Sequence, residues 1–253
     1  MKNRHKSPVF SFIRNPLLLL TTLALISLGA SCNIKGSKDD GDKKGQSRPR
    51  IEAPDFNADS AYHYIQRQVD FGPRVPNTSE HEACAEWLAS KLDTFGAEVI
   101  VQEGTVEAFD GTKLNIKNII GQFQPEKKDR ILLFAHWDTR PFADRDPDPS
   151  MRNKPIDGAN DGGSGVGVLL EIARHLKNNP TNVGIDIIFF DAEDYGTPEH
   201  LDVQYKPDTW CLGSQYWGEH PHKKGYYARY GILLDMVGRK NALFFQERAS
   251  LNM

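Results

Sequence analysis

The sequence predicts an α/β domain in which a mixed, mostly parallel sheet is sandwiched by helices. Two segments, 131–135 and 185–190, are mostly apolar, as are strands that are buried on both faces. The segment 165–177 lies between them and repeats apolar residues at helical spacing. Strands that alternate with amphipathic helices are typical of a sheet covered on both sides. The 39% of hydrophobic residues in a chain of 253 suffices to build such a core.

Local patterns predict the remaining elements. Asn57 can cap a first helix, and Asn77-Thr78-Ser79-Glu80 offers a capping box to a second one. Cys84 falls on the apolar face of that second helix, so we interpret it as a core residue. The expected order is a helix at 58–70, a helix from 77–80 to 96, strands at 97–107, 113–122 and 131–135, a helix at 165–177, a strand at 185–190, a short helix near 212–214 and a strand at 230–236.

The first fifty residues predict export and a lipid anchor. Basic residues precede an uncharged, nearly all apolar run over 17–28, which is typical of a signal peptide, here 1–31. Small residues before Cys32 resemble a lipobox, so we expect Cys32 to be lipidated; an ordinary cleaved signal with an incidental cysteine is the alternative. Residues 32–50 would then be the lipidated cysteine and a flexible polar tether to a catalytic domain at 51–253. This pattern predicts a cell-envelope protein, lipid-anchored to the outer membrane, that is periplasmic or surface-exposed.

Charge and cysteine content exclude several classes of protein. The 31 basic and 34 acidic residues leave a net charge of −3, which argues against a nucleic-acid partner. The three cysteines include no C-x-x-C pair, so neither a disulfide framework nor a cysteine zinc site is expected. The glycine-rich segment 157–165 lacks the G-K-[ST] of a nucleotide-binding loop.

Polar side chains follow three predicted strands at the point where each strand ends. Carboxyl ends of parallel strands meet at one edge of a sheet, where ligand sites form. Carboxylates that converge there repel one another unless a cation joins them, and histidine together with carboxylates suits zinc. The residues at these strand ends are His136, Asp138, Asp191, Glu193, Asp194 and Asp235, and Asp161 lies in the glycine-rich segment.

Each of these residues also has a purely structural interpretation. His136 alone could be a buried histidine bonded to a backbone group, and Asp161 could simply cap the helix that follows it. The acidic run 191–194 could be a solvated strand end. Several such strand ends in one domain nevertheless favour a metal site over these separate explanations.

Other polar and aromatic segments give weaker indications. We expect the acidic run 144–148 to be a surface loop over the cleft. His220 and His222 are expected in an exposed loop. Trp210 and Trp217 could line a pocket or fill the core, and the sequence leaves both possibilities open.

Five separated motifs resemble a known family. In this order and spacing they are similar to the zinc aminopeptidase family, which also contains the animal-type glutaminyl cyclases. The resemblance extends from about residue 57 onward, and the pair Glu193-Asp194 makes the bacterial glutaminyl-peptide cyclotransferases most similar. The motifs are His136-Trp137-Asp138-Thr139, Gly158-Ala159-Asn160-Asp161, Phe189-Phe190-Asp191-Ala192-Glu193-Asp194, Leu212-Gly213-Ser214 and Leu233-Leu234-Asp235.

The resemblance implies a role for each matching residue. Asp161 and Asp194 would hold the zinc that the cyclases retain, and Glu193 would be the general acid and base. His136 and Asp235 would complete a second zinc site with Asp161 in a peptidase. In a cyclase, Asp235 would instead belong to a hydrogen-bond network around the reacting amine.

The implied activity is zinc-dependent conversion of N-terminal glutamine, in peptides or proteins, to pyroglutamate with release of ammonia. Asp138 would orient His136 by a hydrogen bond. A zinc aminopeptidase is the first alternative. The family's further zinc ligand is a histidine in the C-terminal part of the domain, and no histidine follows Asp235. We therefore expect a C-terminally incomplete member of the family, and an inactive lipoprotein is the second alternative.

Overall fold

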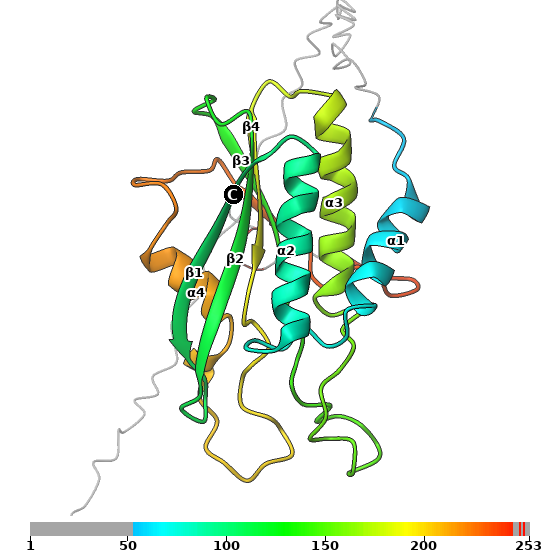
Figure 1. The fold of residues 1–253 in the computed structure, drawn as a ribbon, viewed down its shortest axis with the longest axis vertical. Coiled ribbons are helices and arrows are strands. Elements are labelled where there is room, and N and C mark those ends of the chain that lie inside the picture. Colours follow the sequence, from blue (N-terminus) through cyan, green and yellow to red (C-terminus); the bar gives the residue numbers. More distant parts are fainter. Residues whose placement is uncertain (1–52, 245–247, 249, 251–253) are drawn as a thin grey trace, which may run out of the picture. The chain divides into compact units, whose positions relative to one another are not determined.

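Five strands form one mixed sheet in the order β1-β2-β4-β3-β5 in the computed structural model, which describes residues 53–244, 248 and 250 (Figure 1). β3 pairs in parallel with β4 and β5, whereas β1–β2 and β2–β4 are antiparallel. The predicted α/β class with a mixed sheet is confirmed. The strands are β1 (Glu98–Glu107), β2 (Lys113–Phe123), β3 (Arg130–His136), β4 (Gly184–Phe190) and β5 (Gly231–Leu233).

The predicted signal peptide, Cys32 and tether lie outside the described residues. Within the part that is described, no helix is both long and apolar enough to cross a membrane.

Helices cover both faces of the sheet, as the sequence predicts (Figure 1). α2 and α3 pack on one face, where Ile187 and Phe189 enter the main core, and α1 packs on α3. α4 lies on the other face, where its Trp217 packs against Phe190. Trp217 is therefore partly buried and packs against this part of the core. The helices are α1 (Ala58–Val69), α2 (Ser79–Thr94), α3 (Gly163–Asn178) and α4 (Leu212–Glu219), with a short 3-10 helix at Pro207–Thr209.

Two helix starts differ from the prediction. Thr78 caps α2, because its side chain accepts a hydrogen bond from the backbone N–H of His81 (3.2 Å). Glu80 then occupies the second helical position, so the capping box that needs a glutamate at the third does not form. α3 begins at Gly163, and its cap is Gly162, which makes no side-chain capping bond. Asp161 is thus not the cap of this helix.

β5 is shorter than the strand predicted over 230–236. It pairs with β3 through residues Gly231–Leu233, and the chain turns at Met236, whose φ is +49°. Gly165 of α3 permits this approach, because a Cβ at that position would collide with the carbonyl oxygen of Leu234. The turn places Asp235 at the carboxyl end of the parallel strands.

A buried polar cluster joins the outer face of the sheet to the loop after α4. Asp186 is fully buried and accepts hydrogen bonds from Arg130 Nη2 (2.6 Å) and Tyr226 Oη (2.8 Å). His222, expected in an exposed loop, is partly buried beside this cluster and accepts a hydrogen bond from Trp217 Nε1 (3.0 Å). The expectation is therefore wrong for His222, because the indole N–H that faces the loop needs an acceptor.

His222 predicts a specific pH dependence of stability. Burial lowers its pKa below the usual 6.5. At a pH between the lowered pKa of the folded chain and the usual pKa of the unfolded chain, the unfolded chain binds more protons than the folded one. The contribution of His222 to the free energy of unfolding is therefore present above about pH 6.5 and is lost as the pH falls. We expect His222→Asn to flatten the fall in the free energy of unfolding between about pH 7 and pH 5, measured by urea denaturation in EDTA. His63→Asn, at an exposed site, should keep the wild-type profile, and an unflattened His222→Asn profile would contradict the assignment.

Candidate functional site

His136, Asp161 and Asp235 meet at the carboxyl ends of the parallel strands. His136 ends β3, Asp161 precedes α3 and Asp235 follows β5. His136 Nε2 lies 3.0 Å from Asp161 Oδ1 and 3.6 Å from Asp235 Oδ1. One potential ligand atom of each residue lies within 4.8 Å of the others. An imidazole nitrogen with two carboxylate oxygens is a donor set that zinc accepts.

The electrostatics of this group favour a cation. Burial by itself lowers the pKa of His136, but hydrogen bonds to Asp138, Asp161 and Asp235 raise it well above the usual value. The hydrogen bond with His136 in turn lowers the pKa of Asp235. The carboxylates thus stabilise a positive charge at this position, and a divalent ion would satisfy the same oxygens.

Asp138 connects the candidate metal-binding group, which consists of His136, Asp161 and Asp235, to the turn that follows β4. It is fully buried, and its Oδ1 lies 3.4 Å from His136 Nδ1. Oδ1 and Oδ2 accept hydrogen bonds from the backbone N–H groups of Glu193 (3.0 Å) and Asp194 (3.1 Å). Asp138 is therefore placed within reach of His136, and it also holds the backbone of the two acidic residues.

Asp138→Asn should disturb both arrangements. One carboxylate oxygen becomes an amide N–H₂ that faces a backbone donor, while the size of the side chain is unchanged. We expect zinc affinity to fall by about 10–100-fold, the usual effect of losing a hydrogen bond to a metal ligand. Competition with a chromophoric chelator measures this change, and Asp110→Asn, in an exposed turn, is the control. Wild-type affinity in Asp138→Asn would refute the orienting role.

Glu193 and Asp194 lie on the turn after β4, beside the metal-binding group. Glu193 Oε2 is 3.6 Å from His136 Nδ1, and burial raises the pKa of Glu193. Burial, and then the charge of Asp138, raise the pKa of Asp194 to about 8. Asp194 Oδ2 is inaccessible to solvent and finds no hydrogen-bond partner among the described residues. Such an oxygen is costly unless a cation accompanies it, so this residue fits a metal ligand.

The predicted ligands fall into two candidate sets that share Asp161. One set is His136, Asp161 and Asp235, which lie together. The other is Asp161 with Asp194, and the charge of Asp161 contributes to the raised pKa of Asp194. The other downstream histidines lie elsewhere: His200 Nε2 is 2.8 Å from Asn153 Oδ1, and His220 is exposed. Among the described residues, His136 is the histidine of the metal-binding group.

The acidic run 144–148 is not entirely a surface loop, which corrects the prediction. The Asp144 side chain is only 6% exposed and pairs with Arg140 (2.6 Å). Arg140 also donates from Nη1 to the carbonyl oxygen of Asp194 (2.8 Å) and lies over the ring of Trp210, 4.7 Å from its centroid. Trp210 therefore packs against Arg140, which is bonded to the backbone of Asp194. The buried Arg140 requires a carboxylate partner, and the sequence pattern did not identify Asp144 as that partner.

Two further residues at the site were not predicted. Arg74 is fully buried beneath the glycine-rich segment and donates to the carbonyl oxygens of Asp157 (2.5 Å) and Gly158 (2.9 Å). Cys211 Sγ lies 3.7 Å from Glu193 Oε1. Cys84 and Cys211 are both free, and Cys84 is buried in the core as expected.

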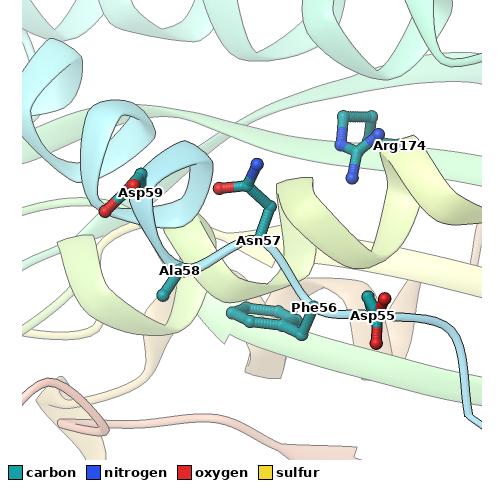
Figure 2. A pocket seen from close by; sticks show the side chains of 6 residues that line it. All are labelled: Asp55, Phe56, Asn57, Ala58, Asp59 and Arg174. Atoms are coloured by element: carbon teal, nitrogen blue, oxygen red, sulfur yellow. The ribbon is translucent and has the colours of Figure 1, made fainter.

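A small cavity of about 80 Å³ opens beside Glu193. A larger hollow of about 410 Å³ lies at the start of α1 and contains none of the predicted site residues (Figure 2). Its Arg174 is paired with Glu171 (2.7 Å). We therefore locate the candidate site at the smaller cavity, because His136 and Glu193 line it. Its lining residues are Phe134, Ala135, His136, Phe190, Asp191, Glu193, Cys211, Ser214 and Leu233.

The chain is similar to solved structures of bacterial exopeptidases and glutaminyl cyclases. A Zn-dependent exopeptidase from Parabacteroides distasonis is 62% identical, with a TM-score of 0.78 over 79% of this chain and 68% of its own. A glutaminyl cyclase from Bacteroides thetaiotaomicron, bound to N-acetylhistamine, is 58% identical, with a TM-score of 0.78 over 79% and 69%.

Sequence comparisons identify the same family. Aminopeptidase YwaD of Bacillus subtilis is 30% identical over 170 residues, which are 66% of this chain and 31% of the relative. The chain thus spans about a third of the length of that curated relative. The model of peptidase family M28 matches residues 118–252. The chain belongs to peptidase family M28.

Proposed function

We propose that this site catalyses the zinc-dependent cyclisation of N-terminal glutamine to pyroglutamate, with release of ammonia. The observation that carries the proposal is Glu193, a carboxyl group with a raised pKa beside, but not within, the group of potential ligands. Similarity to bacterial glutaminyl cyclases supports the choice of reaction.

The residues of the site can perform the required proton transfers. Zinc bound by Asp161 and Asp194 would polarise the side-chain amide carbonyl of the substrate's glutamine. The substrate's α-amine attacks that carbon, and Glu193 accepts the proton that the amine loses. Glu193 then gives this proton to the amide nitrogen, which leaves as ammonia while the ring C–N bond remains. Asp235, whose pKa is lowered by His136, stays ionised and can accept a hydrogen bond from the amine.

A zinc aminopeptidase is the second candidate, and a specific observation favours it. His136, Asp161 and Asp235 lie together, which is the set expected for the additional metal ion of the peptidases. In this reaction Glu193 would take a proton from the water that attacks the first peptide bond.

One assay separates these functions. The zinc-loaded chain is incubated with a Gln-initiated peptide and a Leu-initiated peptide, and products are followed by mass spectrometry and ammonia release. We expect ammonia and a pyroglutamyl peptide from the first and no change in the second. Release of free amino acids instead would establish the peptidase. Zinc binding without either product would support the inactive lipoprotein. The same Gln peptide with an acetylated amine is the control, because it cannot cyclise.

We also propose that Cys32 is lipidated and attaches the protein to the outer membrane. The sequence over 1–31 and the polar residues after Cys32 support this proposal. Wild-type protein should partition with detergent-extracted membranes, and Cys32→Ala should release it. Cys211→Ala, the same change within the domain, should remain in the membrane fraction. Soluble wild-type protein in the periplasmic fraction would contradict the anchor.

A further inference from the structure

We propose that the buried pair of His81 and Asp191 positions Glu193, by holding the turn that begins at Asp191. The inference rests on the proposed role of Glu193 as proton carrier. It gives a structural role to His81 of α2 and to Asp191 at the end of β4, neither of which takes part in the proposed reaction itself.

His81 and Asp191 form a hydrogen bond in the interior of the domain. His81 Nε2 lies 2.8 Å from Asp191 Oδ2, and both side chains are completely buried. An ionised carboxylate can only accept, so His81 donates from Nε2. The imidazole ring of His81 stacks on Trp137, with ring centroids 4.4 Å apart. α2 is thereby connected to the end of β4.

The carboxylate of Asp191 fixes the backbone on either side of it. Its Oδ2 accepts a hydrogen bond from the N–H of Lys117 in β2 (2.6 Å), and its Oδ1 accepts one from the N–H of Ala192 (2.7 Å). Ala192 has a φ of +49°, a left-handed conformation that residues other than glycine rarely adopt. Glu193 follows directly, so the direction of its side chain depends on this unfavourable conformation.

The opposite side of the turn is held by the start of α4. The N–H groups of Cys211, Leu212 and Gly213 each donate across 3.0 Å to the carbonyl oxygens of the turn. Those bonds fix where the turn lies relative to α4. The side chain of Asp191 fixes it from the sheet side, and His81 is the side chain that holds Asp191 in that direction.

The contact with Asp191 leaves the other ring nitrogen of His81 in an unfavourable environment. Its Nδ1 is buried and, within the part of the chain that the structure describes, has no hydrogen-bond partner. Neighbouring buried positions of α2 are apolar, as at Leu88 and Leu92, and an apolar side chain would avoid the unsatisfied nitrogen. What histidine adds at this position is the hydrogen bond to Asp191.

Cys211 provides a probe of the position of Glu193 that needs no turnover. Its thiol lies 3.7 Å from Glu193 Oε1. Burial, and then Glu193, raise the pKa of Cys211 to about 11, and His136 and Asp138 also face the thiol. Movement of the Glu193 carboxylate away from the thiol should therefore lower this pKa. Only the thiolate reacts with alkylating reagents, so the alkylation rate at a fixed pH reports the change.

The experiment measures alkylation of the Cys211 peptide by iodoacetamide, quantified by mass spectrometry, in the full metal-free chain from about pH 7 to pH 10. Glu193→Gln is the reference and should react at least about threefold faster at a fixed pH, because the carboxylate is gone. His81→Leu should change the profile in the same direction. His81→Gln, whose amide can still donate to Asp191, should stay near wild type. Leu88→Ala removes core volume from the same helix without touching Asp191 and is the matched control.

A second route tests the same arrangement through the turn. Ala192→Gly added to His81→Leu should restore the profile in part, because glycine adopts positive φ without strain. If His81→Leu does not fold, Asp191→Asn is tested in its place. It keeps the shape of the side chain and should change the alkylation profile in the direction expected for His81→Leu.

Three results would overturn the proposal. One is a wild-type profile in both His81→Leu and Asp191→Asn. Another is an equal change in Leu88→Ala, which would show general loosening of the core. The third is an unchanged profile in Glu193→Gln, which would show that Glu193 does not lie beside Cys211. A chain that cyclises no glutamine would still give this profile, so failure of the proposed function is recognised separately.

Discussion

Glu193→Gln is expected to lower turnover of a Gln-initiated peptide by about 10²–10⁴-fold, the usual contribution of a general acid and base. The amide has the size of the carboxyl group but cannot accept a proton from the amine or give one to ammonia. Bound zinc should remain near the wild-type amount, because Glu193 lies outside the group His136, Asp161 and Asp235. Initial rates of ammonia release and metal analysis after dialysis measure the two effects.

The same chemical change elsewhere provides the control. Glu199 is exposed on the loop that follows Glu193 and Asp194 and pairs with Arg145, so Glu199→Gln should leave turnover and zinc unchanged. Near-normal turnover of Glu193→Gln would refute the proton-carrier role. A parallel loss of zinc would instead make Glu193 a metal ligand.

The prediction of the fold was most accurate for elements that a pattern of neighbouring residues is sufficient to identify. The runs 131–135 and 185–190 became β3 and β4, because a strand covered on both faces needs apolar residues at most of its positions. Within these runs the exception is Asp186, which is buried and pairs with Arg130. The proximity of His136 and Asp235 could be predicted for a related reason. Each ends or follows a parallel strand, and parallel strands bring their carboxyl ends together.

Interactions between distant parts of the chain could not be predicted in this way. His81 and Asp191 are 110 positions apart, and helical spacing shows only that His81 lies in a helix. Arg140 needed a carboxylate partner, but several aspartates follow it, and only the packing of the loops selects Asp144. Ala192 adopts a left-handed conformation, but the sequence has no glycine at this position that would indicate it.

The second large effect is expected at Asp161. It is the residue common to both ligand sets, so Asp161→Ala should weaken zinc binding whichever set holds the ion. We expect a loss of at least about 100-fold in affinity, the upper end of what losing a ligand's hydrogen-bond partner alone costs. Equilibrium dialysis with metal analysis, or competition with a chelator, measures it. Asp157→Ala, at an exposed position of the same segment, should bind zinc like wild type.

The same titration distinguishes the two proposed reactions when the other ligands are replaced singly. Loss of zinc in Asp194→Ala but not in His136→Ala would place the ion in the set expected for cyclisation. The reverse would place it with His136, Asp161 and Asp235, which favours the peptidase. Two equivalents of zinc, one lost in each variant, would also favour the peptidase. Wild-type binding in Asp161→Ala would exclude both sets, because neither retains its shared carboxylate.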